Sequence, residues 1–571
     1  MLISISPAIA AFARTRIRPE PIVVLAFLIF PLLSLPVMFT SPHVGASLLV
    51  GSGFLVAYAV TSRSRTLLGI EPSCARRLVF GVVFTLLTLT AAGGVTCVLL
   101  WQAGVLFASM SGNQTVADVL LTIMATDLKA FYLAQPLLTA TFLAIALAAI
   151  VALFREPARR LSEPFLRLLT KEKGRGDDAR APQRRSGTHA SLAYLTLIGA
   201  LGLGIATTIY PLLQLHWPGG ADFSWYMMNL RPIHSLSDVV SLLRGDRGLF
   251  LVLLSLTGTI IGASRQDLIS FAPAMLSVLL ALSTFFLVKE GTGRLWVSSF
   301  AAVLSVVSAQ TTLGMYGGII ANWFALSVAN LMSAMIIRSI RLRSPVMAIG
   351  SIALSLALLT GYAYLWVVAV VELLLALVGS IAAFGTYNGR EWKYDVGILS
   401  TVIVSIVLIP IVLLSSLGPD PTLLFALGLR YVQAAGGQTI GSAVSTLESS
   451  LAESRMMLPF VALLSILGLL DHAPQTRCFT KIIAAMVLVP LAIELVSNAS
   501  SYFPLRGLYL IPLYVLAALG AENIICRVNG HVSPWKIRGG LAFAGMFGAY
   551  LFLSQLRYTL MMFGLPLLPS P

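Results

Sequence analysis

PIVVLAFLIFPLLSLPVMF, residues 21 to 39, is the stretch that decides the fold class of this chain. It is an apolar run of about twenty residues, the length that an α-helix needs to cross roughly 30 Å of hydrocarbon. Similar runs recur as far as GGLAFAGMFGAYLFL at residues 539 to 553. Lipid satisfies no backbone polar group, and the short alternating strands of a barrel are not apparent. We therefore expect an all-α polytopic membrane protein.

Composition agrees with this fold class. Hydrophobic residues make up 57% of the 571 residues and charged residues 11%, with a mean hydropathy of +0.90. A soluble domain carries about 25% charged residues. The net charge of +15 gathers in short loops between the apolar runs, which is typical of membrane topology and argues against a nucleic-acid partner. Four cysteines are too few for a disulfide framework.

The basic loops predict the topology. The positive-inside rule places them in the cytoplasm, together with the N-terminus: Arg14 to Arg18, Arg63 to Arg77, Arg155 to Arg185, Arg338 to Arg343, Arg390 to Lys393, Arg477 to Lys481 and Arg527 to Arg538. The loops outside the cell are then residues 105 to 131, 214 to 247, 417 to 455 and 498 to 505.

The stretch between Arg247 and Arg338 contains four apolar segments, and an even number of crossings cannot change sides. We assign residues 248 to 263, the shortest segment, to a juxtamembrane helix at the outer interface. The alternative is that this segment crosses and residues 295 to 310 are re-entrant. The assignment predicts about fifteen spans in the cell membrane, juxtamembrane helices in the outer loops, and a C-terminus outside.

The chain divides into three parts. Residues 1–155 form a predicted N-terminal membrane block of four helices, whose spans carry no charged residue and suit a scaffold or docking role. Residues 156–190 form a basic cytoplasmic linker that includes KEKGRGDDARAPQRRSGTH. Residues 191–571 form the second membrane module, which holds the long outer loops and most of the polar residues. We expect function in this module.

The outer loop ADFSWYMMNLRPIHSLSD, residues 221 to 238, concentrates polar groups. It contains Asp222, Tyr226, Arg231, His234 and Asp238 together with Trp225, and Trp217 lies just before it. A carboxylate at the bilayer surface among aromatic walls could take a proton from a hydroxyl, which is the task of a general base. The alternative is a solvated loop whose Trp and Tyr side chains lie in the interfacial belt.

Two later stretches carry polar groups at predicted outer ends of spans. Tyr316 and Asn322 in MYGGIIANW could line a pocket at the mouth of two helices, or the Gly pair and Asn could make only a turn and a cap. Arg506 and Tyr509 in RGLYLIPLY begin a late span. An Arg there can hold a phosphate bidentately, or serve only as an interfacial anchor.

Glu372 lies in the middle of the apolar run WVVAVVELLLALV, residues 366 to 378. A lone carboxylate at that depth is costly, so it is either a protonated packing contact or half of a proton relay. The sequence contains no P-loop, GxSxG, HExxH or Cys/His metal spacing, which leaves ATP hydrolysis, serine hydrolysis and zinc chemistry without a motif.

The second module resembles the GT-C superfamily of membrane glycosyltransferases, which includes protein O-mannosyltransferases, aminoarabinose transferases and the catalytic subunit of oligosaccharyltransferase. ADFSWY stands where these enzymes have an acidic residue and an aromatic in the first large outer loop. MYGGIIANWFAL is similar to their second outer motif, and RGLYLIPLYVLAALG is similar to their late Arg-containing helix. The resemblance covers roughly residues 190 to 530.

The resemblance implies inverting transfer of a hexosyl or pentosyl group from a polyprenyl-phosphate carrier to an acceptor protein, glycan or lipid at the outer face. Asp222 would deprotonate the acceptor, and Arg506 would hold the lipid phosphate. The substrate-binding residues implied with them are Tyr226, Arg231, His234, Tyr316, Asn322 and Tyr509. Residues 316 to 322 contain no acid, and ADF is not an Asp-x-Asp pair, so a metal-independent branch without a cofactor fits better.

Two other classes remain open. A transporter or flippase for a lipid or small solute would use Glu372 as its coupling group. A noncatalytic membrane subunit would use the first block as its docking surface.

Overall fold

The computed structural model describes residues 145–154, 189–215, 222–243, 245, 247–316, 318–383, 389–416, 459–471, 477–496 and 509–529. These ranges are helical and contain no strand. Most of the first block, the linker, the C-terminal end and the outer loop at 417 to 455 lie outside them. The three-part division, the number of spans and the sides of the termini stay predictions.

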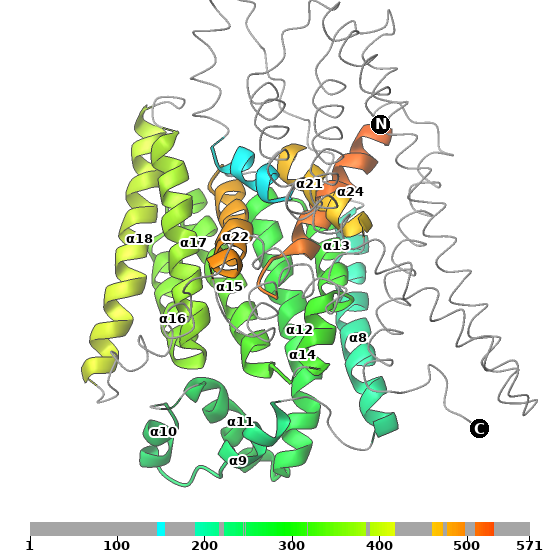
Figure 1. Ribbon diagram of the computed structural model, residues 1–571, viewed down its shortest axis with the longest axis vertical. Helices are drawn as coiled ribbons and strands as arrows, with labels where there is room; N and C mark the ends of the chain where they lie inside the picture. The colour runs from blue at the N-terminus through cyan, green and yellow to red at the C-terminus, as the bar shows by residue number, and fades with distance from the viewer. Residues whose placement is uncertain are drawn as a thin grey trace, which may run out of the picture.

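Figure 1 shows the helices as a bundle with a small group of helices at one end. Their bounds are α8 (His189–Leu215), α9 (Phe223–Asn229), α10 (Leu236–Leu243), α11 (Gly248–Ile261), α12 (Arg265–Thr292), α13 (Leu295–Val306), α14 (Ala309–Tyr316), α15 (Ile320–Leu342), α16 (Pro345–Gly361), α17 (Ala363–Ala382), α18 (Gly389–Ser416), α21 (Pro459–Asp471), α22 (Arg477–Val496) and α24 (Leu513–Asn529).

Four of these helices are long and apolar enough to cross a membrane: α12, α15, α17 and the part of α18 from Asp395 to Leu413. The apolar window of α15 is 83% buried, whereas that of α18 is 28% buried. Helix α15 is therefore central, and α18 presents Val404 and Val412 on the outside of the bundle. Large apolar side chains on an outer helix suit contact with lipid.

Helices α21 and α24 pack through close backbone approach. A Cβ atom added to Gly468 would lie 2.2 Å from the Leu516 carbonyl oxygen, and one added to Gly520 would lie 1.9 Å from the Leu464 carbonyl oxygen. Only glycine fits at both places. Small residues at a helix crossing are typical of helices that associate within a membrane.

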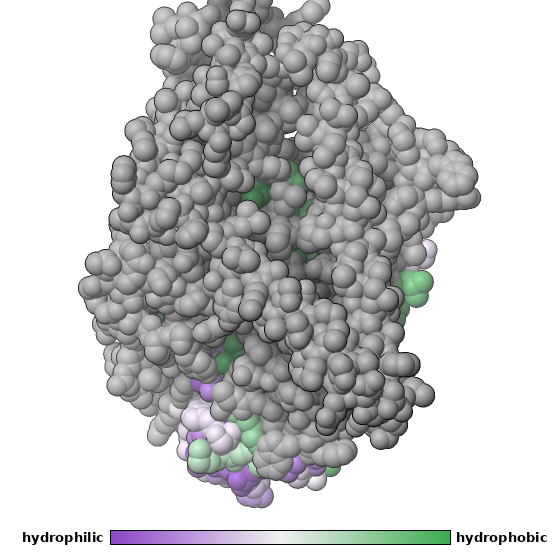
Figure 2. All heavy atoms as spheres, turned by 45° about the vertical axis from the view of Figure 1, so that its right-hand side comes forward, coloured by the Kyte–Doolittle hydropathy of each residue, from purple (hydrophilic) through white to green (hydrophobic). Residues whose placement is uncertain are grey.

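Helices α9, α10 and α11 gather at one end of the bundle (Figure 1). Helix α11 has 14 residues, hence a length of about 21 Å at ~1.5 Å per residue, which is too short for the hydrocarbon core. It covers the segment that the sequence assigns to a juxtamembrane helix. Figure 2 shows hydrophilic side chains at this end, where Arg231, His234 and Ser237 are exposed.

The alternative assignment, a re-entrant segment at 295 to 310, does not match the helices found there. Helix α13 starts directly after α12 ends, at the end of the bundle away from α9. Helix α14 ends next to the start of α15, which contacts α9. The two short helices therefore cross the bundle in series, with a break at Val307 and Ser308.

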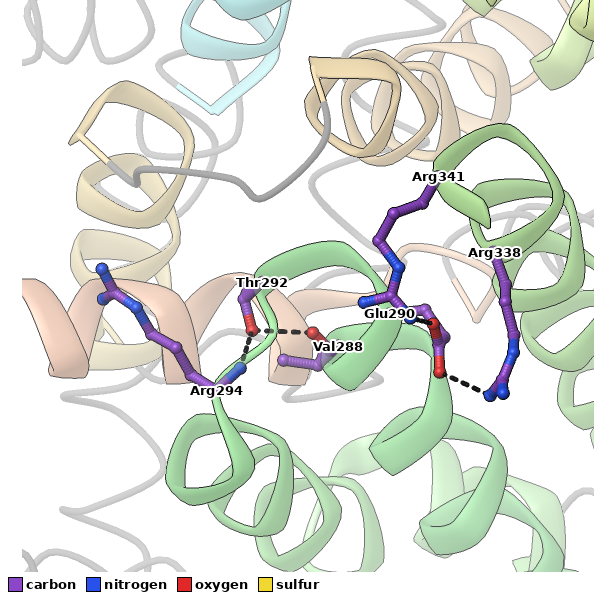
Figure 3. A network of polar contacts seen from close by, with 6 residues as sticks. All are labelled: Val288, Glu290, Thr292, Arg294, Arg338 and Arg341. Carbon is purple, nitrogen blue, oxygen red and sulfur yellow. Dashed lines mark hydrogen bonds and ion pairs between the residues drawn. The ribbon is translucent and has the colours of Figure 1, made fainter. Parts of the chain in front are cut away.

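Ion pairs join helices at the end opposite α9 to α11 (Figure 1), and Figure 3 shows those that Glu290 makes. Glu290 near the end of α12 is 2% exposed and accepts from Arg338 of α15 over 3.0 Å and from Arg341. Arg294, just before α13, pairs with Glu522 of α24. The basic cluster that the sequence places in the cytoplasm thus lies at the opposite end from the predicted outer loop.

Candidate functional site

The candidate site begins at α9. Asp222 precedes its first residue, and the backbone N–H of Tyr226 donates to the Asp222 carbonyl over 3.3 Å. Residues four apart in a helical turn lie on one face, so the carboxylate and the phenol are neighbours. Trp225 packs edge-on against Tyr226, with ring centroids 5.1 Å apart. The order of residues in ADFSWY therefore places an acid beside an aromatic wall.

Arg247 completes this cluster, although it was not among the site residues predicted from the sequence. Its Nη1 donates to Oδ2 of Asp222 over 3.1 Å and to the Tyr226 hydroxyl over 2.9 Å. Its guanidinium lies 4.5 Å from the centre of the Trp225 ring. Arg247 is 8% exposed and has a left-handed backbone with φ 60°, which is uncommon for a residue other than glycine. The cation is therefore held in place beside the acid.

Tyr226 connects the cluster to the central helix α15. Its hydroxyl accepts a hydrogen bond from the backbone N–H of Ala321 over 3.1 Å. Tyr226 is fully buried, and burial raises the pKa of its phenol, while the Arg247 guanidinium opposes that rise. The phenol is thus held in its neutral form between the cation and the first turn of α15.

Asn322 and Trp323 follow Ala321 in that first turn. Asn322 is 2% exposed, and in the described part of the chain neither atom of its side-chain amide has a hydrogen-bond partner. The indole N–H of Trp323 also lacks one there. Burying an unsatisfied amide costs about 1–3 kcal/mol, so we expect a water or a polar ligand beside these groups.

The turn before α15 corrects one alternative raised from the sequence. Gly318 does take the left-handed conformation, with φ 61°, that a turn requires. Asn322, however, does not cap the helix, because the N-cap residue is Ile319 and no side chain caps it. Behind the turn, a Cβ atom on Gly314 of α14 would lie 2.5 Å from the Trp323 ring. Glycine therefore lets α14 and α15 pack closely here.

The other candidate residues are not all brought into this cluster. Arg231 and His234 are exposed on the segment between α9 and α10, and no hydrogen bond joins them to Asp222. Tyr509 is fully buried, and its hydroxyl has no hydrogen-bond partner within the described ranges. The neighbouring Ile511 carbonyl accepts from Gln310 of α14 over 2.9 Å. The Tyr316 side chain and all of Arg506 lie outside the described residues.

Asp238 has a structural role in the outer segment. Its Oδ2 accepts from the backbone N–H groups of His234 and Ser235 over 3.0 and 2.9 Å. Its own N–H donates to the Ser235 hydroxyl over 3.3 Å, which makes the reciprocal pattern of a capping box. The pKa of Asp238 is lowered, first by the His234 N–H and then by the Ser235 hydroxyl. Asp238 therefore starts α10.

Glu372 lies on α17, away from this cluster. It is 7% exposed and lines a small cavity, with room for about one water molecule, together with Asn330 of α15, Met486 of α22 and Leu510. Among the described residues, no group of three or more His, Cys, Asp or Glu side chains could hold a metal ion.

The chain matches no protein-family profile and no curated protein. Among solved structures, it is similar to the archaeal oligosaccharyltransferase AglB from Archaeoglobus fulgidus in complex with an inhibitory peptide and a dolichol-phosphate, with a TM-score of 0.41, 11% identity, and coverage of 65% of this chain and 56% of that chain. The Archaeoglobus fulgidus oligosaccharyltransferase in the apo form gives a TM-score of 0.41, 12% identity and coverage of 64% and 56%. This chain thus aligns with little more than half of the length of either protein.

Proposed function

We propose that the protein is a membrane glycosyltransferase that moves a sugar from a polyprenyl-phosphate carrier to an acceptor at the outer membrane face. One observation carries the proposal: Asp222, Arg247 and the first turn of α15 meet at one end of the bundle through Tyr226. The positive-inside rule assigns this end to the outside. Such a transfer can use a carboxylate as base and a cation to hold the phosphate, and an amide can bind a sugar hydroxyl.

In this mechanism the carboxylate of Asp222 removes the proton from the acceptor nucleophile. The nucleophile forms a bond with the anomeric carbon, and the bond from that carbon to the phosphate oxygen breaks. The electron pair of the broken bond leaves with the polyprenyl phosphate. The configuration inverts because attack and departure occur on opposite faces of the sugar, and no oxidant, reductant or further reactant is needed.

Arg247 has a proposed role as the switch of this step. A guanidinium binds carboxylate and phosphate with the same fork of N–H donors. When the donor phosphate arrives, Arg247 can turn from Asp222 to the phosphate and leave the carboxylate ready to accept a proton. Asn322 and the Trp323 indole N–H are then placed for the sugar or the acceptor. Arg506 stays a proposed second phosphate ligand, and Tyr316, Arg231, His234 and Tyr509 stay proposed substrate contacts.

The test uses membranes that contain the full chain and a panel of polyprenyl-phosphate hexoses and pentoses with labelled sugars. Mass analysis of glycans and glycolipids in a deletion strain identifies the product to follow. Asp222→Asn should lower transfer by at least about 100-fold, because a general base contributes about 10²–10⁴-fold. Asp238→Asn is the matched control: it lies in the same outer segment, caps α10, and should leave transfer unchanged. Undiminished transfer by Asp222→Asn would remove the proposed base.

A second candidate function, transport of a lipid or small solute, is favoured by Glu372 itself, a buried acid near the middle of α17 that could serve as the coupling group. In proteoliposomes, a transporter would lose flux with Glu372→Gln and keep it with Asp222→Asn. A transferase would lose sugar transfer with Asp222→Asn and keep it with Glu372→Gln. If the protein were a noncatalytic subunit, neither variant would change the flux or the sugar transfer.

A further inference from the structure

Glu372 is a buried acid that the proposed transfer reaction does not use. It lies near the middle of the 20 residues of α17, on the face turned toward α15 and α22, whereas Val371 and Leu374 on the same helix are exposed. Within the described residues, burial is the only influence on its carboxyl group, which has no counter-ion and no hydrogen-bond partner there. An isolated carboxylate in an apolar interior is costly, so the group must be neutralised in some way.

The cavity at Glu372 offers one more polar group. Asn330 of α15 donates through Nδ2 to the Tyr514 hydroxyl over 3.1 Å, which leaves its carbonyl oxygen as an acceptor beside the cavity. The remaining lining residues are apolar: Leu326, Ala329, Leu365, Val368, Ala369, Met486 and Leu510. Glu372 is therefore the one titratable group that lines the cavity.

The helices packed around the cavity carry few other charges. Helix α22 contributes the buried Cys478 and Lys481, more than one helical turn from Met486. Helix α18, which also packs against α17, contributes Lys393 and Asp395 near its start. Helix α24 contributes the Tyr514 phenol, and α15 contributes Arg338 and Arg341, which pair with Glu290 at the far end. None of these cations forms an ion pair with Glu372 in the described part of the chain.

The size of the cavity decides between a metal cation and a proton. Calcium and magnesium ions take six or more ligands, mostly oxygen, and a zinc site takes four. This cavity offers one carboxyl group, one amide oxygen and space for a single water. A metal ion bound there would therefore lack most of its ligands. A proton needs only the carboxylate oxygen, and the acid that results can donate to the Asn330 oxygen or to a water in the cavity.

We propose that Glu372 is a proton-binding site inside the membrane module, reached through a water in the cavity and completed by the carbonyl oxygen of Asn330. The inference does not rest on sugar transfer and would stand if Asp222 proved unnecessary. In the protonated state α17 can pack closely against α15 and α22. Loss of the proton would leave a charge between these helices and favour their separation.

Glu290 provides a matched control within the same chain. Both carboxyl groups are buried, at 7% exposure for Glu372 and 2% for Glu290, but Glu290 pairs with two arginines (Figure 3). The apolar reagent dicyclohexylcarbodiimide reacts with a protonated carboxyl group. The acid proton moves to a carbodiimide nitrogen, the carboxyl oxygen bonds to the central carbon, and rearrangement leaves a stable N-acylurea with no leaving group. Peptide mass analysis then locates the adduct.

The full-length protein in lipid nanodiscs should carry the adduct on Glu372 and not on Glu290 at neutral pH. Once the pH exceeds the titration point, labelling should fall about tenfold per pH unit, since the protonated fraction does so. Equal labelling of both residues, no adduct on Glu372 at any pH, or protection by sodium ions at constant pH would each overturn the proposal. Infrared difference spectra between neutral and alkaline pH give a second readout. In the wild type they should contain the band of a protonated carboxylic acid that loses its proton. This band should be absent in Glu372→Gln, and its persistence there would also count against the site.

Discussion

The Tyr226 hydroxyl accepts a hydrogen bond from the backbone N–H of Ala321, 95 residues further along the chain, over 3.1 Å. The N–H groups in the first turn of a helix have no partner within the helix. Tyr226 satisfies one of them, and Arg247 donates to the same oxygen over 2.9 Å. One phenol therefore fixes the outer segment of α9 to α11 against the central helix.

Tyr226→Phe should destabilise the protein by about 1–3 kcal/mol, because the buried Ala321 N–H loses its acceptor. Thermal unfolding in detergent, followed by tryptophan fluorescence, measures the change. Tyr194→Phe is the control, since Tyr194 is 45% exposed on α8 and should unfold as the wild type does. If both variants unfolded at the wild-type temperature, the phenol would not tie α9 to α15.

The same phenol predicts a difference at alkaline pH. Burial raises the pKa of Tyr226 above its ordinary value of 10.0. The stability that depends on the neutral phenol is therefore complete below pH 10.0 and is lost as the pH rises through the pKa of the folded protein. The stability gap between the wild type and Tyr226→Phe should narrow above that pH. A gap that stays constant up to unfolding would contradict the rise in pKa.

The pair formed by Arg247 and Asp222 should behave as one unit. Their side chains are 9% and 19% exposed, so removal of either partner leaves a largely buried charge. A double-mutant cycle with Asp222→Asn and Arg247→Met should give a coupling free energy of about 1–3 kcal/mol, measured by denaturant titration in micelles. If the two substitutions changed the free energy of unfolding additively, Arg247 and Asp222 would not interact. The proposed movement of Arg247 from Asp222 to the phosphate would then have no basis.

The sequence predicts part of this site for a clear reason. Positive charges indicate on which side of the membrane each loop lies, so Asp222, Tyr226 and Asn322 could be expected at one end of the bundle. The structure does bring Tyr226 next to the turn that holds Asn322. Arg247 was missed because its part depends on a left-handed backbone conformation at the start of α11. The RGDRG stretch, in which Arg247 directly precedes Gly248 at the end of a polar loop, was the available signal.

Long-range pairs were beyond the reach of the sequence for a different reason. Hydropathy locates helices but says little about which helices pack together, since one apolar face resembles another. Glu290 and Arg338 meet only because α12 and α15 are neighbours. The capping box at the start of α10, in contrast, lies within the four residues from Ser235 to Asp238, so it is a local signal that sequence reasoning could have used.

Acid should fray α10 before it affects the bundle. Backbone N–H groups hold the pKa of Asp238 below its ordinary value of 3.8. The cap therefore stabilises α10 above that pH, and this stability is lost as the pH falls through the lower pKa of the folded state. Amide hydrogen exchange in α10 should rise there, and should already be fast at neutral pH in Asp238→Ala. Exchange in α15 should not change. Equal acceleration in both helices would point to global unfolding instead.

Glu290 should matter more for stability than either of its arginine partners. Its side chain is 3% exposed, whereas those of Arg338 and Arg341 are 38% and 24% exposed. Glu290→Gln leaves two neighbouring cations without their shared carboxylate, which should cost about 3 kcal/mol, at the lower end for a broken buried pair because water still reaches the arginines. Arg338→Gln keeps the contact from Arg341 to Glu290 and should cost less, because the carboxylate retains a cation. Denaturant titration of the two variants gives the order directly. If Arg338→Gln proved equal or worse, the carboxylate would not be the centre of the network, and the end of α12 would be held to α15 by apolar packing instead.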